Sequence, residues 1–136
     1  MILDRLLIHA KDLLSQELPP LIWDVEPLIS RGDRVVIFGE FRAFKSWILL
    51  HLTWHLATGK QWLETFTVPE PRCVLYVDEE MNERTLRRRG KRLAQGAGIE
   101  GSPPVAFLSR AGVRFDAYGA RTLLNYLKEQ KFTPHV

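Results

Sequence analysis

Short apolar runs alternate with stretches of helical periodicity over most of this chain. The runs show almost no polar alternation, which is typical of strands covered on both faces in a parallel sheet. Three such runs are evident, at residues 34–38, 73–78 and 105–108. Each precedes a stretch that predicts a helix: 45–58, 83–95 and a third that begins after Asp116. This alternation predicts an α/β fold with a mainly parallel sheet flanked by helices.

The helix expected at 45–58 is apolar nearly all round, which predicts that it is buried, and Gly59 is placed to end it. His51 and His55 stand four residues apart on this helix, the spacing of a metal-binding pair. No third ligand is evident in the sequence, and polar residues on a buried helix usually form local hydrogen bonds. We therefore favour a structural role for the two histidines.

The first segment, residues 2–17, carries its apolar side chains on one face at helical spacing. These are Leu3, Leu6, Leu7, Ala10, Leu13 and Leu14. Pro19 and Pro20 end the segment because proline cannot continue a helix. We expect an amphipathic helix within residues 1–18, ahead of a domain at residues 19–136. Docking of this helix on its own domain is the favoured interpretation, and docking on a neighbouring subunit is the alternative.

Composition adds limits to this fold. With 136 residues, 46% of them hydrophobic, the chain is long enough for one domain with a buried core. Cys73 is the only cysteine, which excludes an intramolecular disulfide and indicates a reducing compartment. Residues 1–18 lack a basic leader, and no uninterrupted apolar run reaches the roughly 18 residues of a membrane span. We expect a cytoplasmic protein. The net charge of +3 is too small to indicate nucleic-acid binding by itself.

A phosphate-sized loop lies between the first expected strand and its helix. It reads Gly39-Glu40-Phe41-Arg42-Ala43-Phe44-Lys45-Ser46. A phosphate site of this kind needs converging backbone N–H groups, a helix N-terminus behind them and a lysine that reaches the β- and γ-phosphates. The hydroxyl after that lysine binds Mg²⁺. Gly39, Lys45 and Ser46 supply these parts at the spacing of a P-loop, and an ordinary helix start is the alternative.

The second expected strand ends in the acidic sequence Asp78-Glu79-Glu80. A carboxylate at the C-terminal end of a strand faces the crevice in which α/β sheets bind ligands. Beside a phosphate loop, it could orient or deprotonate a water for attack on the γ-phosphate. The alternative is that these carboxylates only begin the next helix, although Asn82 can cap that helix itself.

Three segments together resemble the RecA-like AAA family ATPases of the RepA and DnaB hexameric-helicase kind. The segments are Gly39–Ser46, Thr58–Leu63 and Val74–Met81, in that order, after a Pro-Pro-Leu-Ile opening. They match a Walker A loop, the Ala-Thr-Gly end of the following helix, and a strand that finishes in an acidic pair. The resemblance covers roughly residues 18–136. It implies a RecA-like P-loop NTPase core.

The resemblance also implies roles for individual residues. Gly39 to Phe44 would form the nucleotide-binding loop, Lys45 the phosphate lysine and Ser46 the Mg²⁺ ligand. Glu80 is similar to the glutamate that activates the attacking water, with Glu79 as the fallback. The implied cofactors are ATP and Mg²⁺. The implied protein is a DNA helicase or replication ATPase of a plasmid, phage or mobile element, with single-stranded DNA and a homo-oligomeric ring as partners.

The sequence departs from the family pattern in two respects. Arg42 and Phe44 stand where the Walker loop prefers glycine, the residue that adopts positive φ without strain. We expect the Walker B strand to be missing from this sequence, which ends at Val136. We therefore expect a domain that is incomplete at its C-terminus and hydrolyses ATP weakly alone. Two alternatives stay open: a non-hydrolysing nucleotide-binding scaffold or regulator, and a nucleic-acid-binding module with a vestigial loop.

The helix expected at 83–95 is strongly basic. Its basic residues are Arg84, Arg87, Arg88, Arg89, Lys91 and Arg92. At about 100° per residue, four of them share one face, whereas Arg87 and Arg89 lie off it. A solvated face is the favoured interpretation. Contact with an acidic surface of a neighbouring subunit, or with nucleic-acid phosphates, is the alternative.

Overall fold

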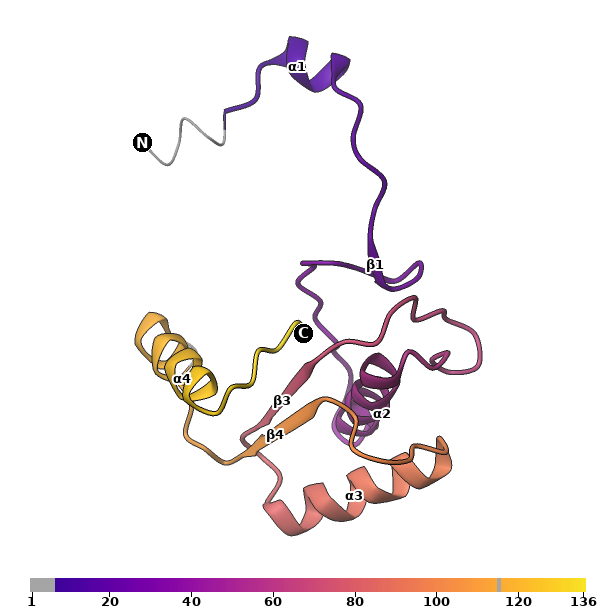
Figure 1. Ribbon diagram of the computed structural model, residues 1–136, viewed down its shortest axis with the longest axis vertical. Coiled ribbons are helices and arrows are strands. Elements are labelled where there is room, and N and C mark those ends of the chain that lie inside the picture. The colour runs from indigo at the N-terminus through magenta and orange to yellow at the C-terminus, as the bar shows by residue number, and fades with distance from the viewer. Residues whose placement is uncertain (1–6, 115) are drawn as a thin grey trace.

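The computed structural model describes residues 7–114 and 116–136 as an α/β arrangement (Figure 1). Its elements in chain order are α1 (Ala10–Ser15), β1 (Trp23–Val25), β2 (Ile29–Ser30), α2 (Lys45–Thr58), β3 (Val74–Asp78), α3 (Glu83–Gly96), β4 (Val105–Ser109) and α4 (Ala117–Glu129). Among these elements, no helix has both the length and the apolar composition needed to cross a bilayer.

Strands β3 and β4 form a parallel pair, as the apolar runs predict. The register is continuous from Val74 opposite Val105 to Asp78 opposite Ser109. Helix α3 makes the crossover between them. The last residue, Val136, lies beside β3: its carbonyl accepts from Leu75 N at 2.8 Å, and its N–H donates to Cys73 O at 3.2 Å. This is the hydrogen-bond pattern of a parallel bridge, and it uses backbone groups of β3 that β4 does not.

The strand expected at residues 34–38 is absent, so that prediction is wrong. The segment has no assigned strand, and within the described chain its backbone makes no hydrogen bond to other backbone groups. Its side chains lie in the open, with Val36 81% and Phe38 90% exposed. An apolar run favours a strand only where a neighbouring strand completes its ladder. Here β3 pairs with β4 and Val136, and no strand of the described residues pairs with residues 34–38.

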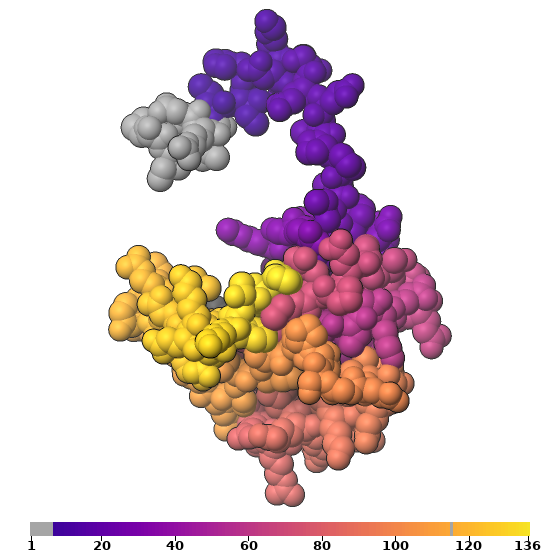
Figure 2. Space-filling model, viewed as in Figure 1, coloured from indigo at the N-terminus to yellow at the C-terminus, as the bar shows by residue number. Residues whose placement is uncertain are grey.

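The N-terminal helix is shorter than expected and does not dock on the body of the protein. Helix α1 has six residues and none of them is buried. Leu13 and Leu14 are 64% and 83% exposed, and α1 projects from the body on an extended stalk (Figures 1 and 2). The favoured intramolecular docking is therefore wrong for the described part of this segment. Leu3 and Leu6 of the expected helix lie outside the described residues.

Helix α2 forms the centre of the packing, with the bounds that its apolar sequence predicts. One face of α2 packs against the β1–β2 hairpin, the connector between α2 and β3, and β3 itself. The buried residues of this cluster are Val25, Leu52, Leu56, Ala57, Trp62, Val68 and Val74. A second cluster joins α2 to α3 and the segment after β3, and contains Leu50, Met81 and Leu86. These two clusters hold α2, which follows the loop at residues 39–44, against β3 and the segment after it.

The β1–β2 hairpin is also attached by charge. Asp24, whose side chain is 6% exposed, has Oδ1 3.1 Å from Nε of Arg72. This contact is an ion pair without the alignment of a good hydrogen bond. Arg31 approaches the same oxygen at 3.6 Å. The arginine that precedes β3 therefore joins the hairpin to the sheet.

Candidate functional site

Two residues of the loop before α2 have positive φ although they are not glycines. Arg42 has φ 67° and Phe44 has φ 57°, both in the left-handed region. These are the positions at which the Walker loop prefers glycine. Holding a residue with a side chain there costs about 1–2 kcal/mol. Backbone strain of this kind is typical of functional sites, where the surrounding structure enforces it.

The two side chains at these strained positions do not fill the loop. Phe44 is 73% exposed, and the Arg42 guanidinium lies over the ring of Phe41, 5.3 Å from its centroid. The opposite side of the loop is closely packed, because a Cβ at Gly39 would lie 3.3 Å from Cβ of Ala43. Within the loop, the N–H of Ala43 donates to the carbonyl oxygen of Glu40 at 3.2 Å.

The side chain of Lys45 folds back onto the loop that precedes it. Its Nζ donates to the carbonyl oxygen of Gly39 at 2.9 Å and to that of Glu40 at 2.7 Å. The ammonium therefore lies next to the N-terminus of the 14-residue helix α2, where no side chain caps the free N–H groups. A helix N-terminus and an adjacent cation together favour an anion.

Ser46 follows in the first turn of α2 and is partly buried. A single hydroxyl beside phosphate oxygens suits Mg²⁺, which prefers oxygen ligands and keeps several waters. The residues present therefore fit a phosphate-bound Mg²⁺ better than a metal held by the protein alone. The described residues contain no group of three or more His, Cys, Asp or Glu side chains that could hold a metal ion.

The three carboxylates at the end of β3 have different surroundings. Asp78 is 9% exposed, and its Oδ1 accepts from the N–H groups of Glu80 and Met81 at 2.9 Å and 2.6 Å. The Glu79 carboxylate accepts from the N–H groups of Gly112 and Val113, both at 3.1 Å. These two acids hold loops in place.

Glu80 differs from both. Its side chain is exposed, and in the described structure its carboxylate makes no hydrogen bond or ion pair. Its carbonyl oxygen accepts from Arg110, at 2.9 Å from Nη2, which fixes the backbone. Of the three acids, Glu80 is therefore the one free to meet a ligand. This favours Glu80 over the fallback Glu79, although the catalytic role of Glu80 stays a prediction.

Hydrogen bonds within the fold occupy both ring nitrogens of His55 and one of His51, whose Nδ1 is buried without a partner among the described residues. His55 Nδ1 lies 2.9 Å from the carbonyl oxygen of Gln61, so it carries the proton, and His55 Nε2 lies 3.1 Å from His51 Nε2. Burial, and then the proximity of His55, lowers the pKa of His51.

Helix α3 presents most of its basic residues to solvent. Arg84, Arg88, Lys91 and Arg92 are exposed, and no ion pair joins them to another described residue. Arg87 pairs with Glu83, with Nε 2.7 Å from Oε1. Arg89 is different: it is partly buried and turned toward α2 and the end of β3. Sequence reasoning placed Arg89 off the basic face but did not identify its contacts.

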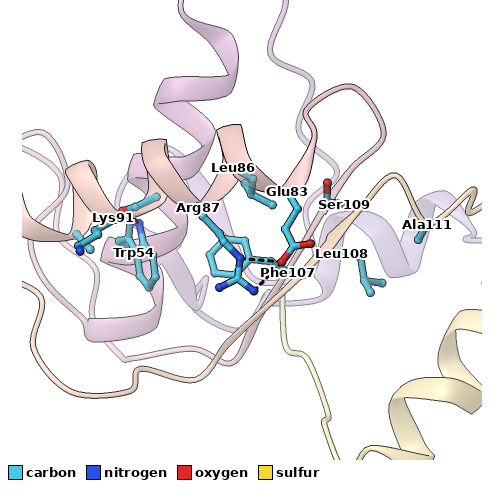
Figure 3. Close-up of a pocket in the computed structure, with 11 residues that line it drawn as sticks. Trp54, Glu83, Leu86, Arg87, Lys91, Phe107, Leu108, Ser109 and Ala111 are labelled. Atoms are coloured by element: carbon cyan, nitrogen blue, oxygen red, sulfur yellow. Dashed lines mark hydrogen bonds and ion pairs between the residues drawn. The ribbon is translucent and has the colours of Figure 1, made fainter.

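A pocket of about 700 Å³ lies elsewhere, between α3 and β4 (Figure 3). Its walls include Trp54, Leu86 and Phe107, with the Glu83–Arg87 pair at its edge. No residue of the loop 39–46 lines this pocket. This pocket is therefore separate from the loop at residues 39–46, and we assign it no part in the proposed phosphate site.

Comparison with known proteins gives one match. A family model described as "AAA domain" matches residues 3–128. No curated protein and no solved structure matches the chain.

Proposed function

The chain belongs to the AAA domain family, and we propose that its loop at residues 39–46 binds the phosphates of Mg-ATP. The family supports an ATP-binding, ATPase-like function. The observation that carries the assignment to this loop is its backbone: Arg42 and Phe44 both adopt the positive φ that a Walker loop requires, directly before a long helix. An ordinary helix start has no need of two strained residues.

In this proposal, each residue of the loop has a stated task. The N–H groups of the loop and of the start of α2 would hold a phosphate, and Lys45 would exchange its two carbonyl partners for phosphate oxygens. Ser46 would hold Mg²⁺, whose charge would offset that of the phosphates. Because Lys45 is already beside the loop, it needs only a side-chain rotation to reach a bound anion.

Glu80 takes the role of orienting a water toward the γ-phosphate. Its free carboxylate at the C-terminal end of β3 supports this role, and so does the buried contact of its neighbour Met81 with Leu50 of α2.

We propose the RecA-like kind of AAA ATPase, of the RepA and DnaB type, as the closest description. A DNA helicase or replication role, with single-stranded DNA and a ring of subunits, follows from this as part of the proposal.

A second candidate is a scaffold or regulator that binds nucleotide without hydrolysing it. The two missing glycines favour it, because Phe44 and Arg42 make the loop stiffer and costlier to hold than a glycine loop. A single-turnover assay with radiolabelled ATP separates the candidates. Turnover that is lost in Glu80→Gln and retained in Glu79→Gln supports an ATPase. Nucleotide binding with no turnover above that of Glu80→Gln supports the scaffold.

A further inference from the structure

Arg89 differs from the other basic residues of α3 in what its guanidinium touches. Arg89 Cζ lies 5.1 Å from the centroid of the Trp47 ring, and Nη1 lies 3.3 Å from Sδ of Met81. A guanidinium over an indole face is a favourable cation–π arrangement, and it is stronger where water is partly excluded. Its neighbour Arg88 is exposed.

The two residues that Arg89 touches have particular places in the chain. Trp47 directly follows Ser46, in the first turn of α2, and Met81 directly follows Glu80. One side chain of α3 therefore contacts the residue next to the Mg²⁺ ligand and the residue next to the free carboxylate. Among the described residues, no other side chain makes hydrogen-bond or cation–π contacts with both segments.

Charged groups near the end of β3, Arg89 among them, also act on the hydroxyl of Tyr76. Burial, and then the Asp78 carboxylate, raises the pKa of the Tyr76 hydroxyl, while the charge of Arg89 opposes the increase and that of Glu80 adds to it. Tyr76 also donates to Asp78 Oδ2 at 3.3 Å. Arg89 therefore brings a positive charge near Tyr76, opposite in sign to the charges of Asp78 and Glu80.

We propose that Arg89 is a positioning residue that joins the first turn of α2 to the end of β3 and so sets the place of Glu80 relative to Ser46. The inference rests on the proposed roles of Ser46 and Glu80, and it assigns Arg89 no contact with nucleotide. Loss of Arg89 should leave the phosphate loop able to bind nucleotide, because Lys45 and the backbone are untouched. It should weaken binding of any species that needs Glu80 in place.

The contact itself is tested without nucleotide. The protein is labelled with 5-fluorotryptophan, and the ¹⁹F resonance of Trp47 is assigned with Trp47→Phe. Arg89→Ala is expected to shift the Trp47 resonance and leave that of Trp62 in place, whereas Arg88→Ala, which changes the same charge one residue away, should shift neither. An unchanged Trp47 resonance in Arg89→Ala would overturn the proposal.

The positioning role is tested with two ligands. Mg-ADP affinity of Arg89→Ala is expected to stay within about twofold of wild type, whereas affinity for Mg-ADP with aluminium fluoride, a mimic of the transferring phosphoryl group, should fall about tenfold. Glu80→Gln should show the same split, and the double variant should be no worse than either single variant. Equal losses for both ligands, or additive losses in the double variant, would contradict the proposal.

Arg89→Lys distinguishes planar contact from charge. Lysine keeps the charge but cannot place a flat guanidinium over Trp47 while reaching Met81. Arg89→Lys should restore less than half of the difference in binding free energy between the two ligands that Arg89→Ala removes. Full rescue would show that the charge alone is sufficient, and it would contradict a role for the guanidinium contact with Trp47 and Met81. If wild type binds neither ligand, the proposed function fails, and the fluorine experiment still decides whether the contact exists.

Discussion

The ammonium of Lys45 lies 2.7 Å from the carbonyl oxygen of Glu40 and 2.9 Å from that of Gly39, so the lysine is folded over its own loop. These carbonyls satisfy part of its hydrogen-bonding capacity in the absence of an anion. A phosphate would offer anionic acceptors in place of these neutral carbonyls, so each hydrogen bond of the ammonium would also be an ion pair. In the proposed function, Lys45 exchanges its internal partners for such a ligand.

The strained loop predicts a stabilising substitution. Phe44→Gly should raise the free energy of unfolding by about 1 kcal/mol, because glycine adopts positive φ without the steric cost of a Cβ. Urea unfolding measures it. Phe44→Ala removes the same ring but keeps the Cβ, so it should give no such gain. Equal stabilisation by both variants would mean that the exposed ring, and not the backbone, is the source.

Burial of Leu50 predicts a large difference between two neighbouring leucines. Leu50 has no exposed surface and joins α2 to Met81 and Leu86, so Leu50→Ala should cost about 2–5 kcal/mol of unfolding free energy. Leu49→Ala is the matched control, because Leu49 is 39% exposed and should cost about 1 kcal/mol or less. Similar losses for the two variants would contradict the orientation of α2, in which Leu50 faces the core and Leu49 faces solvent.

The buried ion pair of the hairpin predicts coupled losses. Asp24→Ala leaves Arg72 nearly buried without its partner, so it should cost about 3 kcal/mol. Replacing both, as Asp24→Ala with Arg72→Met, should cost clearly less than the sum of the two single variants. Additive losses in thermal or urea unfolding would show that the two residues do not interact.

The histidine pair predicts a pH dependence with a definite sign. Burial lowers the pKa of His51 in the folded protein below its ordinary value of 6.5. Below that value the unfolded chain binds more protons than the folded one, so the free energy of unfolding should decrease as the pH falls from 6.5 through the lowered pKa. His51→Leu should flatten this part of the profile. The same slope in wild type and variant would rule out His51 as its cause.

The sequence predicts α2 well because two signals agree there. Its residues are apolar on all sides, as a central helix requires, and Gly59 adopts the left-handed conformation that ends it. The preference of the Walker loop for glycine likewise predicts where positive φ occurs, and Arg42 and Phe44 are found in that conformation. Local chemistry decides these features, so local sequence is sufficient to foresee them.

The features that the sequence does not predict depend on contacts between distant parts of the chain. Residues 34–38 have the composition of a buried strand, but composition does not say whether another strand lies alongside. Helical periodicity places Arg89 off the basic face of α3, yet it cannot say that Trp47 and Met81 meet it there. Both features depend on groups far away in the sequence, which a pattern read along one chain does not specify.

The central claim is that residues 39–46 bind the phosphates of Mg-ATP through Lys45. Titration of a fluorescent ATP analogue into the wild-type chain and Lys45→Ala tests it, with Lys91→Ala as an equal change of charge at an exposed lysine of α3. We expect Lys45→Ala to weaken binding about tenfold or more, and Lys91→Ala to leave it within about twofold. Equal affinities of wild type and Lys45→Ala would contradict the account.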